Sequence, residues 1–246
     1  MVRRKLKRLL APSFWKVAKK KFTWVVSPSP GPHKKFECIP LQILLRDILK
    51  VVETGREAKK VIARGEVWVD GKPRKDYAYP AGLYDVVWIP KLKKIFRIIS
   101  TPKGLELVEI DEKEKDVKLV KILNKTTIKG GKTQLNLNDG KNILVEDGSK
   151  FKTGDSLLIK LPSLEIVEHL PLKKGMLALI MKGKNKGKMG KVVELIPGKF
   201  RTKPKVILEV NGNKIEALKD YVFVIGKDKP IIKVVKWMNT LWEKFL

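Results

Sequence analysis

The residue types that carry most proton-transfer and metal chemistry in enzymes are scarce in this sequence. Histidine is the usual general base near neutral pH, and the chain has only His33 and His169, in separate regions. Neither stands in a His-Glu-x-x-His or Cys-x-x-Cys pattern, and the single cysteine, Cys38, leaves no ligand set for structural zinc. We therefore predict no catalytic residue, no metal site and no cofactor.

Two glycine-rich stretches resemble phosphate-binding loops without completing one. Residues 130–133 read Gly-Gly-Lys-Thr, but the first glycine of a P-loop would have to stand at position 126, which is Thr126. Residues 183–190 lie between two predicted strands, so no following helix offers its N-terminus to a phosphate. Acids gather among lysines at residues 111–116, a mixture typical of a solvated turn. The sequence predicts a binding protein rather than an enzyme, with no small-molecule substrate.

The charge of the chain indicates a polyanionic partner. Lysine and arginine total 54 against 26 aspartate and glutamate, so the net charge is +28. Such an excess repels itself unless nucleic acid or an anionic membrane surface neutralises it. The most apolar stretch, residues 40–52, is short and contains Arg46 and Asp47, so no membrane span is predicted. A membrane-surface protein needs an apolar face beside the basic one, and Leu9 and Leu10 are too little for this. We expect the partner to be nucleic acid and not a membrane.

The first 37 residues are predicted to form a basic N-terminal extension. Residues 1–35 contain eleven lysines and arginines, and no acid precedes Glu37. Aromatic residues such as Trp15 lie among these charges, so the extension either packs on the body of the protein or stacks on bases while its lysines hold phosphates. Lys16 and the lysines at 19–21 interrupt the apolar run that a secretory signal needs. Together with the single cysteine, this predicts a protein of a reducing compartment, the cytoplasm.

Two helices are predicted after the extension. Apolar residues recur at helical spacing over residues 41–49. A second helix is predicted over residues 55–64, because Thr54 and Glu57 form a capping box and Gly65 suits a left-handed terminus. This second helix has an apolar stripe for packing and an opposite face that is basic. The basic face carries Arg56, Lys59, Lys60 and Arg64.

The rest of the chain predicts β structure. Val67 and Val69 followed by the turn Asp70-Gly71 predict a hairpin, and short alternating runs separated by glycine-containing turns continue to residue 225. The expected fold class is α+β, mainly β. The predicted domains are the basic extension at 1–37, a helix-helix-hairpin domain at 38–100, a central all-β domain at 101–171, a small barrel at 172–226 and a C-terminal tail or helix at 227–246.

Residues 40–89 resemble a known RNA-binding module. The run Leu-Gln-Ile-Leu-Leu-Arg, followed by Gly-Arg-Glu-Ala-Lys-Lys-Val-Ile-Ala-Arg-Gly-Glu-Val-Trp-Val-Asp-Gly-Lys, is similar to the S-four type RNA-binding domain of ribosomal proteins, some tRNA synthetases and pseudouridine synthases. In that family the second helix and the adjoining turn face RNA. The resemblance implies an RNA contact surface made of Arg56, Lys59, Lys60, Arg64, Lys72, Arg74 and Lys75.

Residues 174–196 resemble the KOW motif of ribosomal and transcription-elongation proteins. Glycines punctuate the run, which lets the backbone turn tightly and approach a ligand, and the lysines between them supply charge. The resemblance implies an SH3-like KOW barrel at residues 172–226. Its predicted RNA contacts are Lys182, Gly183, Lys184, Lys186 and Lys188.

The order of all these segments resembles one family. A leader with Lys-Arg-Leu-Leu-Ala-Pro-Ser-Phe-Trp and Pro-Gly-Pro-His-Lys, then Tyr-Pro-Ala-Gly-Leu-Tyr-Asp-Val-Val, and at the end Tyr-Val-Phe-Val-Ile-Gly-Lys, are similar to the small-subunit ribosomal protein S-four-e family of archaea and eukaryotes. The resemblance implies a structural constituent of the small ribosomal subunit that binds ribosomal RNA and neighbouring small-subunit proteins and supports assembly and translation. The compact, lysine-rich form suits the archaeal type. A non-ribosomal RNA-binding factor acting in translation or RNA modification is the alternative.

On this interpretation the N-terminal extension also contacts RNA. As a hypothesis, it threads between RNA helices and orders only on binding, as basic extensions can. Its predicted contacts are Arg3, Arg4, Lys5, Lys7, Arg8, Trp15, Lys16, Lys19, Lys20, Lys21, His33, Lys34 and Lys35.

Overall fold

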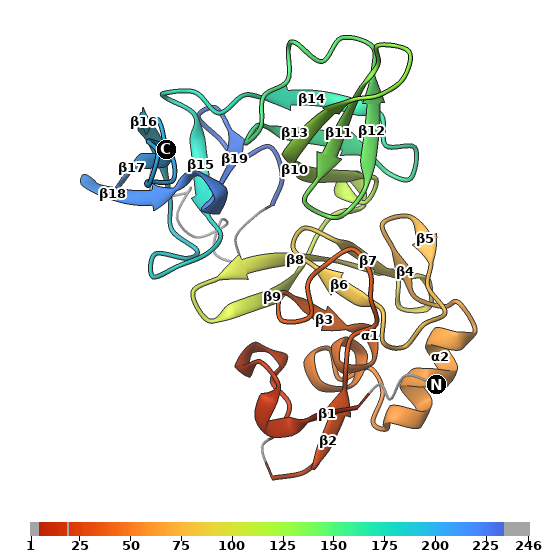
Figure 1. Ribbon diagram of the computed structural model, residues 1–246. Helices are drawn as coiled ribbons and strands as arrows, with labels where there is room; N and C mark the ends of the chain where they lie inside the picture. The colour runs from red at the N-terminus through yellow and green to blue at the C-terminus, as the bar shows by residue number, and fades with distance from the viewer. Residues whose placement is uncertain (1–4, 19, 234–246) are drawn as a thin grey trace. The chain divides into compact units, whose positions relative to one another are not determined.

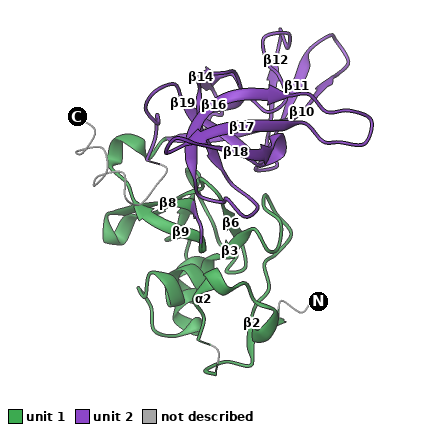
Figure 2. Ribbon diagram, turned by 90° about the vertical axis from the view of Figure 1, so that its left-hand side faces the viewer, with its two compact units in different colours: residues 1–99, 103–116 green, residues 100–102, 117–246 purple. Residues whose placement is uncertain are grey.

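The computed structural model describes residues 5–18 and 20–233 and is mostly β with few helices. Contacts between residues divide the chain into two compact units, which Figure 2 colours separately. Unit 1 comprises residues 1–99 and 103–116, and unit 2 comprises residues 100–102 and 117–246. No helix within the described ranges has the length and apolar character that crossing a membrane requires.

The N-terminal extension is part of the folded body of unit 1. Strand β1 (Lys5–Lys7) pairs antiparallel with β2 (Trp24–Val26), with Leu6 opposite Val25 and both side chains buried. Two short 3-10 turns lie between these strands, at Arg8–Leu10 and Ser13–Trp15. The extension therefore has secondary structure and a buried side of its own.

Trp15 anchors the extension in the core of unit 1. Its side chain is 0% exposed, and its indole Nε1 donates a hydrogen bond to the carbonyl oxygen of Cys38 at 2.8 Å. Val17 is buried in the same apolar cluster. A large aromatic ring that is buried and hydrogen-bonded stabilises the segment that carries it. This contradicts the hypothesis that the extension orders only on binding RNA.

Two helical segments and a five-stranded sheet complete unit 1. Helix α1 (Leu41–Ile43) continues into a π-helical turn, Leu44–Ile48, and α2 (Gly55–Ala63) follows, so both predicted helices are present. Their apolar sides share one cluster with the sheet. The sheet order is β5-β4-β7-β8-β9, and β3 pairs separately with β6 (Figure 1). The strands are β3 (Cys38–Pro40), β4 (Trp68–Val69), β5 (Lys72–Pro73), β6 (Pro80–Gly82), β7 (Val86–Ile89), β8 (Lys94–Thr101) and β9 (Gly104–Glu109).

Strand β9 belongs to the sheet of unit 1, whereas the sequence places its residues in the central domain. It follows β8 through the two-residue turn Pro102-Lys103 and begins at Gly104, whose φ of +128° suits glycine. It hydrogen-bonds to β8 as the edge of the sheet. The amide of Ile110 donates to the carbonyl of Ile95 at 3.0 Å and extends this pairing. Further short 3-10 turns lie at Pro90–Leu92 and Glu112–Glu114.

Unit 2 contains two five-stranded antiparallel sheets. In the first, the order is β12-β11-β10-β13-β14, and a bulge between Ile122 and Asn124 lets the long β10 pair with β13 along its first half and with β11 along its second. Val120, Ile122 and Leu157 are buried in its core. The strands are β10 (Val117–Thr127), β11 (Thr133–Leu137), β12 (Asn142–Val145), β13 (Ser156–Lys160) and β14 (Ile166–Leu170).

The second sheet of unit 2 has the order β18-β17-β16-β15-β19, so its last strand returns to pair with its first. Gly190 sits where β16 and β17 approach closely, because a Cβ there would lie 2.2 Å from the carbonyl oxygen of Glu209. The strands are β15 (Leu177–Ile180), β16 (Met189–Ile196), β17 (Lys205–Val210), β18 (Asn213–Leu218) and β19 (Val222–Gly226), with a 3-10 turn at Lys219–Tyr221. Most of the predicted tail or helix at 227–246 lies outside the described residues.

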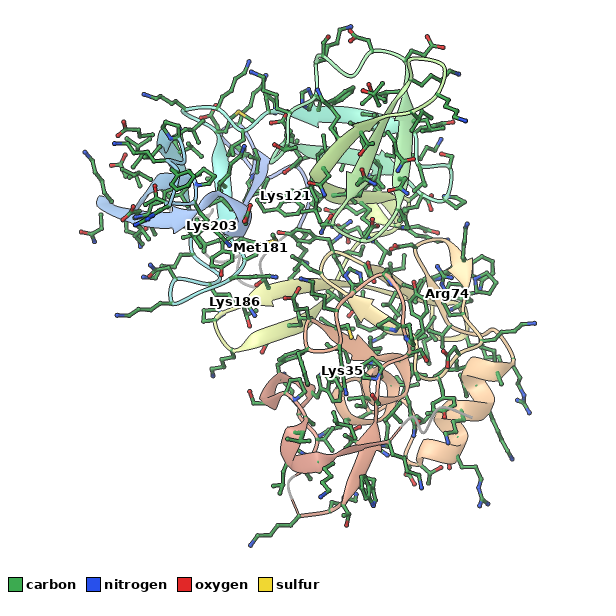
Figure 3. All side chains as sticks on the ribbon, in the orientation of Figure 1. Lys35, Arg74, Lys121, Met181, Lys186 and Lys203 are labelled. Atoms are coloured by element: carbon green, nitrogen blue, oxygen red, sulfur yellow. The ribbon has the colours of Figure 1, made fainter. Side chains whose placement is uncertain are left out.

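A buried lysine connects the two sheets of unit 2. The ammonium of Lys121 on β10 donates hydrogen bonds to the carbonyl oxygens of Lys219 at 2.9 Å, Asp220 at 3.1 Å and Val222 at 2.6 Å (Lys121 is labelled in Figure 3). Burial lowers the pKa of Lys121 to about 8, with Lys219 and Lys182 adding to the shift and Asp220 opposing it. This cation therefore has a structural role inside the protein.

Candidate nucleic-acid interface

Local signals in the sequence determine where α2 begins and ends. The hydroxyl of Thr54 accepts a hydrogen bond from the amide of Glu57 at 3.2 Å, and the Glu57 carboxylate accepts from the amide of Thr54 at 3.4 Å. The Thr54 hydroxyl, followed by the amides of Glu53 and Thr54 that donate to the Glu57 carboxylate, lowers the pKa of Glu57 below its usual value. At the other end Gly65 has a φ of +74°, which favours glycine, so the helix ends as predicted.

One side of α2 packs and the other is basic, as its spacing predicts. Ala58 and Ile62 are fully buried in unit 1. Because residues three to four apart share a face of a helix, the cations between these positions point outward. The exposed cations on α2 and at its C-terminal end are Arg56, Lys59, Lys60 and Arg64.

The hairpin β4–β5 lies beside the C-terminal end of α2. Its turn, Asp70-Gly71, has positive φ at both residues, +53° and +72°, which matches the twist of a two-residue hairpin. A Cβ on Gly65 would lie 3.8 Å from Cε of Lys75, so the hairpin and the helix end are adjacent. Lys72 and Lys75 are exposed, and Arg74, labelled in Figure 3, is half-buried. The helix and hairpin cations predicted from the sequence therefore form one surface, which we call the α2 face.

Two tyrosines that the sequence analysis missed support this surface. The ammonium of Lys59 lies 4.4 Å from the ring centroid of Tyr77, and the guanidinium of Arg74 lies 4.5 Å from that of Tyr79. Both rings are partly buried against the core cluster of unit 1. The tyrosines therefore hold two of the cations in fixed positions. Residues 76–79 form a turn, in which the amide of Tyr79 donates to the carbonyl oxygen of Asp76 at 3.1 Å, so no periodic pattern in the sequence marks the two rings.

An acidic residue neutralises part of the charge at the edge of the α2 face. The carboxylate of Glu66 lies 2.7 Å from the ammonium of Lys91 and 4.0 Å from the guanidinium of Arg64. Surface ion pairs of this kind contribute little to stability. Phosphate groups can therefore compete with Glu66 for both cations at small cost.

Most of the predicted cations of the N-terminal extension are exposed. Lys16 is one of them, and its ammonium lies 3.6 Å from the carboxylate of Glu106. Arg3, Arg4 and Lys19 lie outside the described residues. The exposed cations in the described part are Lys5, Lys7, Lys16, Lys20, Lys21, Lys34 and Lys35.

Three residues predicted as RNA contacts of the extension are engaged inside the protein. Trp15 is in the core and has no exposed face for a base. The guanidinium of Arg8 donates from Nε to the carbonyl oxygen of Val17 at 2.9 Å and is buried. His33 has 7% of its side chain exposed, and its Nε2 lies 3.0 Å from both carboxylate oxygens of Asp85. We correct these three assignments, because their polar atoms and ring faces are used for packing.

The loop between β15 and β16 carries the predicted contacts of unit 2. Gly183 and Gly187 have φ values of +85° and +83°, and the amide of Gly187 donates to the carbonyl of Ile180 at 2.7 Å, which closes the loop. Lys184 and Lys188 are exposed, and the ammonium of Lys188 donates to the side-chain oxygen of Asn185 at 3.0 Å. The other two predicted cations, Lys182 and Lys186, are half-buried.

Comparison with known proteins indicates the family. Three family models match: "RS4NT (NUC023) domain" at residues 2–36, "S4 domain" at 39–87 and "Ribosomal family S4e" at 92–166. The protein named "Small ribosomal subunit protein eS4" of Methanothermobacter thermautotrophicus is 44% identical over 234 residues, which cover 94% of this chain and 96% of the relative. That of Archaeoglobus fulgidus is 46% identical over 229 residues, covering 92% and 96%. The chain belongs to the ribosomal family S4e.

A solved structure in the same family has a similar fold. The 30S ribosomal protein S4e of Thermoplasma acidophilum matches with a TM-score of 0.67 and 27% identity, covering 78% of this chain and 96% of that one. The S4-domain match, residues 39–87, contains α2, the hairpin β4–β5 and both tyrosines of the α2 face. The cations, the hairpin and the rings that hold the cations thus occur together within one matched domain of this S4e chain.

Proposed function

We propose that this chain is a structural constituent of the small ribosomal subunit, where it binds ribosomal RNA and supports assembly and translation. The observation that carries this proposal is end-to-end similarity to small ribosomal subunit proteins eS4 at 44% to 46% identity, with nearly the whole of each relative covered. Its place of action is accordingly the ribosome. Because this family consists of structural proteins, we propose that the chain acts by binding alone.

The α2 face is the part of unit 1 that we propose to bind RNA. All of its cations except the half-buried Arg74 are exposed. Aromatic rings contact Lys59 and Arg74, which limits the side-chain freedom that these two lose on meeting phosphates. Lysine and arginine displace the counterions that condense on RNA, which makes binding favourable and strongly dependent on salt. The arginines can also bind a phosphate through two parallel hydrogen bonds.

The exposed cations of the extension and the loop between β15 and β16 are proposed as additional contacts. The five strands of residues 177–226 fit the proposed SH3-like KOW barrel, because β19 returns to pair with β15 and a glycine allows close approach of β16 and β17. Under this layout the loop with Gly183 and Gly187 is the KOW turn. Neighbouring ribosomal proteins are proposed as further partners.

The experiment that tests the α2 face measures the affinity of the full chain for a small-subunit ribosomal RNA transcript at several salt concentrations. The test variant replaces Arg56, Lys59, Lys60 and Arg64 with glutamine. We expect weaker binding and a shallower dependence of log affinity on log salt, by roughly 3, since each lost phosphate contact lowers the slope by somewhat less than one.

A matched control removes the same number of charges from two loops that connect strands of the first sheet of unit 2, β10 to β11 and β12 to β13. It replaces Lys129, Lys132, Lys150 and Lys152, which are exposed, with glutamine. If both variants lose the same affinity and slope, net charge alone drives binding and the α2 face has no special role. A preferential loss in the α2 variant supports the proposal.

A further inference from the structure

The hairpin between β16 and β17 places an aromatic ring fully in solvent. Phe200 is 99% exposed, whereas the other phenylalanines of the described chain are all more covered. Its neighbours Lys199, Arg201 and Lys203 are exposed as well. Burying an aromatic side chain is strongly favourable, so a partner that covers this ring would gain affinity from it. No pattern in the sequence predicts a contact for these residues.

The tip of this hairpin is a defined structure. Lys199 and Thr202 exchange two backbone hydrogen bonds, each 3.0 Å, and the amide of Lys199 also contacts the Thr202 hydroxyl oxygen at 3.2 Å. Phe200 and Arg201 are therefore the two residues of a tight turn. A Cβ on Gly198 would lie 2.9 Å from the carbonyl oxygen of Thr202, so glycine permits this closure. The backbone that carries the ring is therefore held in place, which lowers the backbone entropy lost on binding.

Charge favours a polyanionic partner for this tip. No acid occurs between Glu194 and Glu209, and the segment contains Lys199, Arg201, Lys203 and Lys205. Of these, Lys205 is paired with Glu216 at 2.7 Å, and none of the other three forms an ion pair with any residue in the described part of the chain. An apolar pocket on a protein would match the ring but would leave the surrounding cations without partners. A nucleic acid offers a partner to the ring and to the cations, because bases stack on aromatic rings and phosphates bind the cations.

We propose that the hairpin tip, Lys199 to Lys203, is a further RNA-binding element, in which Phe200 stacks on an unpaired base of ribosomal RNA while Lys199, Arg201 and Lys203 contact the flanking phosphates. This proposal rests on the proposed function and adds a base-stacking contact that the lysine loop between β15 and β16 does not offer. The element lies outside the three matched family ranges, which end at residue 166.

The test measures the affinity of the full chain for the small-subunit ribosomal RNA transcript after three changes at one position. Phe200→Ala and Phe200→Leu remove the aromatic face, and we expect each to weaken binding roughly 5- to 100-fold, the range of a lost base stack. Phe200→Trp keeps an aromatic face and should bind like the wild-type chain. Leu144→Ala is the control, since Leu144 is another exposed apolar residue, on β12. Thermal unfolding checks that all variants fold. We expect the Phe200 variants to melt like the wild-type chain, because the side chain at position 200 is almost fully exposed.

A photoreactive phenylalanine at position 200, in small subunits assembled with the full chain, identifies the contact directly. We expect it to crosslink to ribosomal RNA. Crosslinking to a neighbouring protein, or unchanged affinity in Phe200→Ala while the wild-type chain binds RNA, would overturn the hairpin proposal and leave the proposed function intact. If the wild-type chain itself fails to bind the transcript, the proposed function fails, and the hairpin proposal fails with it.

Discussion

At the scale of single residues, the cations of this protein serve two purposes. Those on the α2 face, all exposed except the half-buried Arg74, can meet phosphates. Others are structural: the ammonium of Lys118 is buried 3.0 Å from the carboxylate of Asp139, and Lys121 donates to three backbone carbonyls. Arg8 is likewise used within the extension. The total of 54 lysines and arginines therefore overstates the number of cations available to a partner.

Replacing Lys121 with methionine should destabilise unit 2. The substitution leaves three carbonyl oxygens without their donor, and buried groups that lose a partner typically cost about 1–3 kcal/mol. Urea unfolding at pH 7 measures the loss. Lys160→Met is the control, because Lys160 is exposed on β13 and should change the free energy of unfolding very little.

The decrease in the free energy of unfolding caused by Lys121→Met should become larger as the pH rises. The folded protein releases the proton of Lys121 near pH 8, whereas the unfolded chain keeps it to about pH 10.5. Between these values the unfolded state binds more protons, so the contribution of Lys121 to stability rises with pH. Unfolding at pH 7 and pH 9.5 tests this. An equal loss at both values would show that the pKa of Lys121 is not shifted.

Cys38 should be unreactive in the folded protein. Burial, with smaller effects from Asp85 and Glu37, raises the pKa of its thiol to about 12, so almost no thiolate forms at pH 8. We expect a disulfide reagent to label the native chain more than about 1,000-fold more slowly than the chain in guanidinium chloride. Rapid labelling of the native protein would mean that the β3 region opens readily.

At the scale of elements, the N-terminal extension is a structural part of unit 1 as well as a carrier of charge. Trp15→Ala should lower the free energy of unfolding by about 3–5 kcal/mol, because it empties a fully buried site. Trp24→Ala provides the control, since Trp24 is 51% exposed on β2. This substitution should lower the free energy of unfolding clearly less. Similar losses in both variants would contradict the core role of Trp15.

Features that depend on neighbouring residues in the sequence were predictable, whereas contacts between residues far apart in the sequence were not. The start of α2 at Thr54 and its end at Gly65 depend on contacts within one turn, so the sequence predicts them correctly. Trp15, by contrast, is buried through a partner 23 positions away, Cys38. The pairing of His33 with Asp85 is equally non-local. Neither contact leaves a periodic pattern in the sequence, so both residues were assigned to RNA instead of the core.

At the scale of the whole molecule, the family and the mainly β fold could be predicted, because the order and spacing of several segments agree with those of the S4e family along nearly the entire chain. The candidate site was predictable on α2, where a helical repeat separates a packing side from a basic side. Tyr77, Tyr79 and the hairpin tip at Phe200 were missed, since their roles depend on exposure and on contacts with the cations. Composition indicates a polyanionic partner but does not distinguish structural cations from free ones.

Ultraviolet crosslinking in the native cells, followed by sequencing of the attached RNA and mapping of the crosslinked peptides, tests the central claim most directly. We expect reads concentrated in one compact region of small-subunit ribosomal RNA, with peptides from residues 55–79 among those attached. Reads spread over transfer and messenger RNAs would contradict a ribosomal role and would indicate an RNA-binding factor that acts elsewhere.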